Sequence, residues 1–243
     1  MADQRVAILR TNVALGPKTR LLSFSLPVGT AFPFVGGKYI IVNTGLPLAG
    51  GKIRKRAYSI VSQDTEAASF QIAVRQVGVA TDFLHAFTPG QQLFFSGPWG
   101  KFVSAAPDTE EITWVLATDT GITAALGLLQ AAQFRNALSR TELVWWRTSP
   151  EYFLPEALVR ERIPTELADF QIISAPTIGD PERIAQGQKW LKEKLQLARP
   201  DRVYLAGDGL MLLPWMEMFA AEGVPADRMH LETFFNHAKS KFL

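Results

Sequence analysis

The 243-residue sequence contains no cysteine. This absence excludes disulfide bonds, thiolate nucleophiles, cysteine-ligated zinc and any iron–sulfur cluster held by the chain's own cysteines. The three histidines, His85, His230 and His237, lack the i, i+4 spacing that a metal site on one helix requires, so we predict no metal site and expect them to be structural. Any redox chemistry therefore needs a non-covalent organic cofactor.

The sequence also lacks a strong excess of one charge and long apolar runs. Its 25 basic and 23 acidic residues give a formal net charge of +2, which argues against a nucleic-acid partner. No run of about eighteen apolar residues exists to cross a membrane, and the segment Met1–Arg5 lacks the features of a signal peptide. We therefore expect a cytoplasmic monomer with no membrane association.

The hydrophobic pattern changes once along the chain. Up to about residue 107, short β-branched or aromatic runs are separated by glycine and proline, a spacing typical of an antiparallel β-barrel. The predicted barrel strands are Val6–Leu9, Thr19–Ser25, Lys38–Val42, Ala57–Ser62, Phe70–Val77 and Gln92–Ser96.

Beyond Pro107, apolar strands alternate with amphipathic helical stretches, which predicts βαβ units and a doubly wound sheet of five parallel strands. The predicted strands are Ile112–Ala117, Thr141–Trp146, Phe170–Ser174, Arg202–Ala206 and Met229–Thr233. The predicted helices are Ala124–Leu138, Arg183–Leu197 and Leu210–Glu222. We place the boundary near Ala105–Thr109, which divides the chain into predicted domains 1–107 and 108–243.

The first informative motif, Arg56-Ala57-Tyr58-Ser59-Ile60, lies at the end of a predicted strand. A planar cation with bidentate donors suits a pyrophosphate, and an aromatic ring can stack on a flat cofactor. Taken alone, the motif is equally compatible with an ordinary strand that alternates aromatic and polar residues.

A glycine turn, Gly78-Val79-Ala80-Thr81, follows the next predicted strand. Glycine allows close approach of the backbone, and a threonine that opens a helix offers amides, a hydroxyl and the positive helix end to a phosphate. We expect Thr81 to be both the helix N-cap and a phosphate ligand. Taken alone, the segment is equally compatible with a plain helix cap.

Further small-residue segments follow in order. Ser96–Phe102 contains the pattern Gly-Pro-x-Gly-x-Phe. Thr118–Ala124 joins a predicted strand to a helix, which is the place where a small-residue turn binds the pyrophosphate of a dinucleotide. Ala206–Met211 follows the fourth parallel strand, and Glu232 precedes two phenylalanines in the last one.

The order and spacing of these segments resemble the ferredoxin-NADP reductase family over about residues 5–236. The resemblance implies FAD in the barrel and NADH or NADPH in the second domain. It also implies Arg56 on the FAD pyrophosphate, Tyr58 against the flavin ring and Ser59 near flavin N5. The catalytic residues it implies are Tyr58, Ser59, Ala206 and Glu232. The cofactor-binding residues it implies are Arg56, Tyr58, Ser59, Ile60, Val74, Gly78, Val79, Ala80, Thr81, Thr120, Gly121, Arg147, Asp180, Arg183, Gly207, Asp208, Phe234 and Phe235.

Three positions depart from the family pattern. Asp119 stands where glycine is usual, Ala124 where proline is usual, and Ala206 where cysteine is usual. A carboxylate near a bound pyrophosphate would lower affinity unless it turned outward to cap the helix. We therefore expect altered nicotinamide binding and slower hydride transfer, with the flavin chemistry retained.

The segment Ala175–Gln188 bears on the choice of nicotinamide. It carries Asp180 and Gln188 where arginines for a 2′-phosphate are expected from the resemblance, although Arg147 and Arg183 lie nearby and could reach such a phosphate. We favour NADH.

We predict hydride transfer between the nicotinamide and FAD, followed by release of single electrons to a separate acceptor. Lys52, Arg54 and Lys55 could dock an acidic ferredoxin or flavodoxin, and could equally be a solvated basic edge. Two alternatives stay open. One is a ferric-siderophore or other component flavin reductase, and the other is an FAD-binding electron-transfer or regulatory module with impaired nicotinamide turnover.

Overall fold

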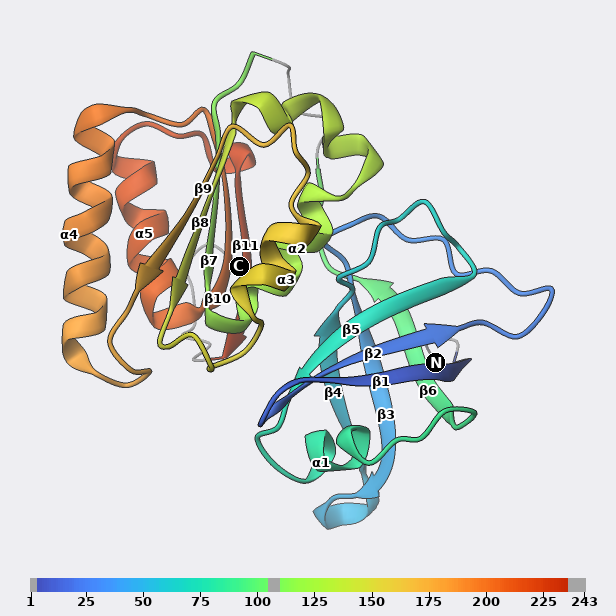
Figure 1. Ribbon diagram of the computed structural model, residues 1–243. Helices are drawn as coiled ribbons and strands as arrows, with labels where there is room; N and C mark the ends of the chain where they lie inside the picture. Colours follow the sequence, from blue (N-terminus) through green and yellow to red (C-terminus); the bar gives the residue numbers. More distant parts are fainter. Residues whose placement is uncertain (1–3, 105–109, 236–243) are drawn as a thin grey trace.

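The computed structural model describes residues 4–104 and 110–235, which form two domains lying side by side (Figure 1). The predicted boundary at residues 105–109 and the histidine at position 237 lie outside the described residues. No helix within the described ranges is both long enough and apolar enough to cross a membrane.

The first domain is an antiparallel barrel of six strands in the order β4-β3-β6-β1-β2-β5. Phenylalanines fill its interior, and the rings of Phe32 and Phe95 lie 5.1 Å apart in an edge-to-face contact. A single short helix, α1, closes one end of the barrel (Figure 1). The bounds are β1 Arg5–Gly16, β2 Thr19–Ser25, β3 Tyr39–Pro47, β4 Ile53–Ser59, β5 Ser69–Arg75, α1 Val79–His85 and β6 Gln92–Trp99.

The second domain is a parallel sheet of five strands in the order β11-β10-β7-β8-β9. Helices α4 and α5 cover one face, whereas α2 and α3 cover the face turned toward the barrel (Figure 1). Strands β7 and β10 are buried at every residue, as expected for the centre of a sheet covered on both faces. The bounds are β7 Thr113–Thr118, α2 Ile122–Leu129, β8 Thr141–Arg147, α3 Glu156–Arg162, β9 Asp169–Ser174, α4 Pro181–Leu197, β10 Arg202–Asp208, α5 Gly209–Ala221 and β11 Met229–Phe235.

The predicted fold class is confirmed, but two helical predictions need correction. The helix predicted over Ala124–Leu138 is broken, because Ala131 has an extended backbone and the Ala132 N–H donates to the Asp64 carboxylate of the barrel (3.1 Å). A 3-10 segment, Ala132–Arg140, follows the break. Helix α3 was not predicted, because a single helical stretch of seven residues after Pro155 has too few turns to show a clear periodicity.

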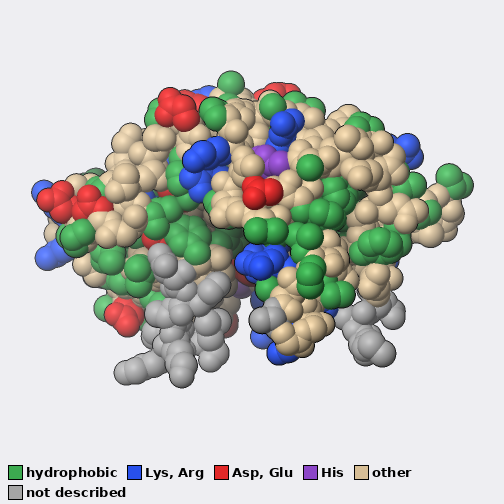
Figure 2. Space-filling model, turned by 90° about the horizontal axis from the view of Figure 1, so that it is seen from below, with side chains coloured by type: hydrophobic (Ala, Val, Ile, Leu, Met, Phe, Trp, Pro, Cys, Tyr) green, Lys and Arg blue, Asp and Glu red, His purple; other side chains and the backbone are tan. Residues whose placement is uncertain are grey.

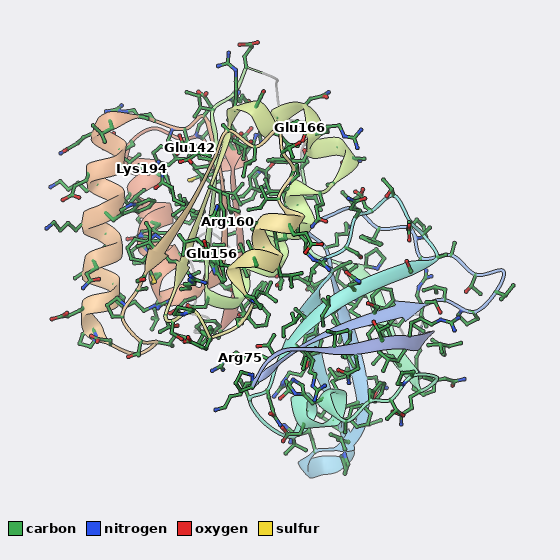
Figure 3. All side chains as sticks on the ribbon, viewed as in Figure 1. Arg75, Glu142, Glu156, Arg160, Glu166 and Lys194 are labelled. Atoms are coloured by element: carbon green, nitrogen blue, oxygen red, sulfur yellow. The ribbon has the colours of Figure 1, made fainter. Side chains whose placement is uncertain are left out.

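The two domains touch through backbone atoms as well as side chains. A Cβ atom on Gly127 of α2 would lie 2.5 Å from the Ile60 carbonyl oxygen and 2.9 Å from the Gly37 nitrogen. At a separate contact between the domains, Arg75 at the end of β5 points toward the second domain (Figure 3), where its Nε donates to the Tyr152 carbonyl oxygen (2.9 Å). The relative position of the domains therefore depends on a helix that carries no side chain at its point of closest approach.

We predict that Gly127→Ala destabilises the protein, although alanine is the better helix former by about 1 kcal/mol. The added methyl group has no space at the domain contact, and overpacking of this kind costs about 1–3 kcal/mol. Urea unfolding measures the change. The control is Gly16→Ala, where a Cβ atom meets nothing within 4 Å. Equal or greater stability of Gly127→Ala than of the wild-type chain would contradict this account of the contact.

Candidate active site in the cleft between the domains

A cavity of about 620 Å³ lies between the barrel and the carboxyl edge of the parallel sheet. In Figure 1 the strands β8 and β9 point downward, and Figure 2 shows the molecule from that side, where basic, acidic and hydrophobic side chains meet near the middle of the face. The residues that line the cavity are Tyr39, Arg56, Ala57, Tyr58, Ser59, Ala73, Arg75, Val77, Thr81, Thr120, Thr123, Tyr152, Phe153, Ile178, Glu232, Thr233, Phe234 and Phe235.

Strand β4 forms the barrel wall of the cavity. It pairs with β3 so that Ser59 lies opposite Tyr39 and Arg56 lies opposite Val42. The Tyr58 hydroxyl is buried without a hydrogen-bond partner among the described residues, and burial raises its pKa, so the phenol stays neutral. Arg56 is exposed, and its Nη1 donates to the Lys55 carbonyl oxygen (3.1 Å), which leaves further N–H donors for an anion.

The loop before α1 differs from the prediction. Gly78 is the N-cap, with a φ of 149° that favours glycine, and Thr81 lies in the first turn. The Thr81 hydroxyl accepts from the N–H groups of Val77 (2.8 Å) and Gly78 (3.0 Å) and donates to the Gly78 carbonyl oxygen (2.7 Å). The predicted N-cap role of Thr81 is therefore wrong, because its hydroxyl orders the loop from inside the helix.

Strand β11 forms the facing wall. Glu232 pairs in register with Ala206 of β10, and burial raises the pKa of Glu232 to about 7. Gly100 lies close to this carboxyl group. A Cβ atom added at Gly100 would lie 3.6 Å from the Glu232 Oε2 and would also touch the Tyr39 ring. Burial, and then the nearby Glu232 charge, raise the pKa of Tyr39. This wall thus holds a carboxyl group that is about half protonated near neutral pH.

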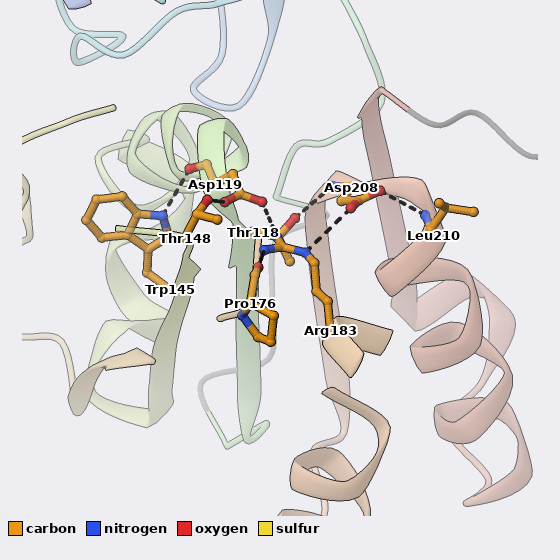
Figure 4. A network of polar contacts seen from close by, with 8 residues as sticks. All are labelled: Thr118, Asp119, Trp145, Thr148, Pro176, Arg183, Asp208 and Leu210. Carbon is orange, nitrogen blue, oxygen red and sulfur yellow. Dashed lines mark hydrogen bonds and ion pairs between the residues drawn. The ribbon is translucent and has the colours of Figure 1, made fainter. Parts of the chain in front are cut away.

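The turn between β7 and α2 contains an unusual aspartate. Asp119 has a φ of 51°, a left-handed conformation that non-glycine residues seldom adopt, and it is fully buried. Figure 4 shows its carboxylate paired with Arg183 and accepting from the Thr148 hydroxyl (2.8 Å), while its carbonyl oxygen accepts from the Trp145 ring nitrogen (3.0 Å). Asp119 therefore does not turn outward to cap the helix, which was the one arrangement named above that would leave affinity for a pyrophosphate unchanged.

Burial is also the main influence on the ionisation of this aspartate. It raises the pKa of Asp119, whereas the Arg183 cation and the hydrogen bond from Thr148 oppose the rise. Asp208, the last residue of β10, adds a second carboxylate, whose Oδ1 accepts from the Leu210 N–H (3.1 Å). The carboxyl edge thus carries two acidic groups around one guanidinium.

The cations expected to reach a 2′-phosphate have other partners. Arg183 is 1% exposed and pairs with Asp119. The Arg147 Nη2 lies 3.0 Å from the Glu156 Oε2, and its guanidinium lies over the Trp145 ring. Asp180, predicted to meet the ribose, is the N-cap of α4 and accepts from the Glu182 N–H (2.9 Å).

The remaining predicted residues divide into two groups. The cavity is lined by Arg56, Tyr58, Ser59, Thr81, Thr120, Glu232, Phe234 and Phe235. The others do not line it; Ile60, Val74 and Ala206 have fully buried side chains, so only their backbones are available to a ligand. The functional assignments of all these residues stay predictions.

The barrel is similar in sequence to a known family of domains. Residues 7–103 match the family model described as the oxidoreductase FAD-binding domain. The barrel is thus similar to an oxidoreductase FAD-binding domain over nearly its whole length. The whole chain is 26% identical over 238 residues to the heme-dependent oxidative N-demethylase beta subunit of Ectopseudomonas mendocina (strain ymp), an alignment that covers 96% of this chain and 69% of that protein.

Solved structures share the fold of both domains. The Flavohem-like-FAD/NAD binding domain of nitric oxide dioxygenase from Vibrio cholerae O1 biovar El Tor superposes with a TM-score of 0.73 at 17% identity, covering 95% of this chain and 98% of that one. The ferredoxin reductase in carbazole 1,9a-dioxygenase superposes with a TM-score of 0.75 at 20% identity, covering 96% and 68%. Together with the family match over residues 7–103, these likenesses confirm the predicted two-domain fold.

The cavity beside the FAD-binding domain suits an elongated aromatic cofactor. Its volume lies within the range of about 300–1,000 Å³ usual for ligand pockets. The buried Tyr58 hydroxyl lacks a partner, and the first N–H groups of α1, those of Val79 and Ala80, have no protein acceptor among the described residues. An exposed guanidinium and an aromatic ring on one wall, with two amides at the adjoining start of α1, are groups that bind a pyrophosphate and a flat ring system.

Sequence reasoning missed several residues of this cavity. Tyr39 carried no motif of its own and becomes recognisable only through its pairing with Ser59. Tyr152 lies in an irregular loop, where its ring receives the Arg75 guanidinium at 4.1 Å. The position of Arg75, three residues before the glycine turn, was the only sequence signal available for this contact.

We predict that Glu232→Gln changes how stability depends on pH. The folded chain holds the Glu232 proton up to a pKa of about 7, whereas the ordinary value is 4.5. Because the folded state binds this proton more tightly, the stability contribution of the group is lost as the pH rises between these values. Urea unfolding at about pH 5 and about pH 8 should therefore show a smaller loss of stability in Glu232→Gln than in the wild-type chain. The exposed Glu217→Gln on α5 is the control, and an identical pH dependence in all three proteins would contradict the raised pKa.

Proposed function

We propose that this chain is an FAD-dependent reductase that takes a hydride from a nicotinamide dinucleotide, preferably NADH, and passes single electrons to a separate acceptor. The observation that carries the proposal is the cavity itself. Tyr58 and Ser59 of the FAD-binding domain lie on one wall, and Thr120, Glu232 and Phe234 of the parallel sheet domain lie on the other. A cavity at the carboxyl edge of a parallel sheet, beside a flavin domain, is suited to bringing two cofactors together.

FAD, when bound, supplies a ring that accepts a hydride and gives up electrons one at a time. The residues of β4 would hold it, with the Arg56 guanidinium on the pyrophosphate and the Tyr58 side chain against the ring. The N–H groups at the start of α1 would take further phosphate oxygens, because the Thr81 hydroxyl holds the loop that presents them.

The facing wall of the cavity, formed by β11, would exclude water and would bind or release a proton. Phe234 and Phe235 offer an apolar cover for the ring face. The Glu232 carboxyl, with a pKa of about 7, can hold or release a proton at Oε2 near neutral pH. The phenols of Tyr39, Tyr58 and Tyr152 also line the cavity, and burial raises the pKa of each, so they would donate hydrogen bonds as neutral groups.

The preference for NADH rests on the partners of the nearby cations. Arg183 and Arg147 are engaged by Asp119 and Glu156, and Asp180 occupies a helix N-cap. A 2′-phosphate needs an available cation, whereas the ribose diol of NADH needs only neutral or acidic acceptors.

The acceptor we favour is an acidic iron–sulfur or flavin protein of the ferredoxin or flavodoxin type. The exposed Lys52 and Lys55 lie on the hairpin that also carries the FAD-binding strand, and positive charge beside a redox centre guides an acidic partner. The likeness to a ferredoxin reductase and to a heme-dependent demethylase beta subunit supports a component of a longer electron-transfer chain.

Anaerobic mixing of the FAD-loaded protein with NADH and with NADPH tests the proposal. We expect NADH to bleach the flavin absorbance faster than NADPH does. Faster bleaching by NADPH would contradict the NADH preference, and bleaching by neither would identify an FAD-binding module without nicotinamide turnover. Reoxidation of the bleached protein by an acidic ferredoxin, and not by a ferric siderophore, would distinguish our proposal from a siderophore reductase.

A further inference from the structure

One buried guanidinium connects the chain segments that follow four of the five parallel strands, at the carboxyl edge beside the cavity. Arg183, in the first turn of α4, pairs with Asp119 after β7, and its Nε lies 3.7 Å from the Asp208 Oδ2 at the end of β10 (Figure 4). Its Nη1 donates to the carbonyl oxygen of Pro176, in the loop after β9 (2.7 Å). Thr148, after β8, donates to the other Asp119 oxygen. A single side chain therefore links the ends of four strands.

The turn Thr118–Gly121, which Arg183 supports, is packed closely against the backbone of β10. A Cβ atom on Gly121 would overlap the Ala206 carbonyl oxygen, and one on Gly207 would overlap Thr118. Thr118 also accepts from the Asp208 N–H through its hydroxyl (2.7 Å). The left-handed backbone of Asp119 is a conformation that persists only where the surroundings impose it. Here the surroundings are the Arg183 ion pair and two close backbone contacts.

We propose that Arg183 is a positioning residue for the dinucleotide: acting through Asp119, it holds the turn Thr118–Gly121 in the conformation that receives the pyrophosphate. The inference rests on the proposed function, since it assigns the turn to a nicotinamide dinucleotide. Arg183 is 1% exposed, so its guanidinium is covered by protein atoms and would act on a ligand through the turn. Thr120 of the same turn lines the cavity, so the ordered segment reaches the ligand side.

The charges of the cluster make the role of Arg183 testable. Arg183 pairs with the buried Asp119 and lies beside Asp208, so removing its guanidinium leaves the Asp119 carboxylate without the cation that it pairs with here. Such a carboxylate must protonate, draw in water or displace the turn, because an unpaired buried charge is strongly unfavourable. Displacement of the turn and the added negative potential both weaken binding of a pyrophosphate.

Calorimetric titration with ADP-ribose, the dinucleotide without its nicotinamide, measures this effect apart from hydride transfer. We expect Arg183→Gln, in the FAD-loaded full chain, to bind ADP-ribose about tenfold more weakly or worse than the wild-type chain. Arg202→Gln is the matched control. It removes a buried arginine from the other end of β10, where Arg202 pairs with Glu111 (2.8 Å), and it should leave ADP-ribose affinity unchanged.

The double variant Asp119→Asn/Arg183→Gln separates positioning from general destabilisation. Asparagine tolerates the left-handed backbone and can accept from Thr148, and the double change restores the net charge of the cluster. We expect the double variant to bind ADP-ribose more tightly than Arg183→Gln, because the unpaired carboxylate at position 119 is gone. We expect the single variant Asp119→Asn, which loses the ion pair that holds the turn, to bind more weakly than the wild-type chain. If Arg183→Gln does not fold, Asp119→Asn still tests the inference, since wild-type affinity in that variant would overturn it.

Steady-state kinetics with NADH provide a second, independent test of the positioning role of Arg183. Arg183→Gln should raise the KM for NADH with little change in kcat or in the flavin spectrum, whereas Arg202→Gln should change neither constant. Wild-type affinity in Arg183→Gln, or an equal loss in Arg202→Gln, would overturn the positioning role. Failure of the wild-type chain itself to bind ADP-ribose would instead refute the proposed function, and the inference with it.

Discussion

The close approach of helix α2 to the barrel is the contact on which the rest of the molecule depends. Gly127 brings the helix backbone against the Ile60 carbonyl, immediately after the strand that carries Tyr58 and Ser59. Helix α2 begins directly after the turn Asp119–Gly121, so the same helix connects this turn to the barrel wall of the cavity. A side chain at position 127 would separate the two walls of the cavity.

Polar contacts between the barrel and the second domain surround the close approach at Gly127 and restrain the orientation of one domain relative to the other. The Asp64 carboxylate accepts from the Gly36 N–H in the barrel and from the Ala132 N–H after α2. The Arg162 Nη2 donates to the Gln71 Oε1 (2.7 Å), and its Nη1 donates to the Val61 carbonyl oxygen (3.2 Å). Several weak restraints around one tight contact give a cavity with a defined shape, which is what orientation of two cofactors requires.

The fold was largely predictable because its signals are local. Period-two alternation and turn residues identify the barrel strands, and apolar runs such as Ile112–Ala117 identify the buried parallel strands. The errors arose where tertiary contacts decide local structure. The break after α2 depends on Asp64, which lies 68 residues from Ala132. The conformation of Asp119, for which the sequence carried no prediction, likewise depends on Arg183, which lies 64 residues away.

The candidate site shows the same division. Arg56, Tyr58 and Ser59 form one continuous motif and were found in the sequence, whereas Tyr39 and Tyr152 enter the cavity only when separate segments meet. Thr81 was predicted to be the N-cap of the helix. The N-cap is instead Gly78, because glycine can adopt the backbone that the cap requires, and Thr81 lies inside the first turn. Chemistry carried by neighbouring residues is visible in a sequence, and chemistry assembled across domains is not.

The central claim is that the cavity brings nicotinamide C4 and the flavin ring into direct contact. Anaerobic rapid mixing with NADH deuterated separately at each of the two C4 positions tests it, because the cavity would present only one nicotinamide face to the flavin. We predict slower bleaching of the flavin with one of the two deuterated forms and an unchanged rate with the other. Equal rates with both forms and with ordinary NADH, or no bleaching at all, would contradict hydride transfer in this cavity.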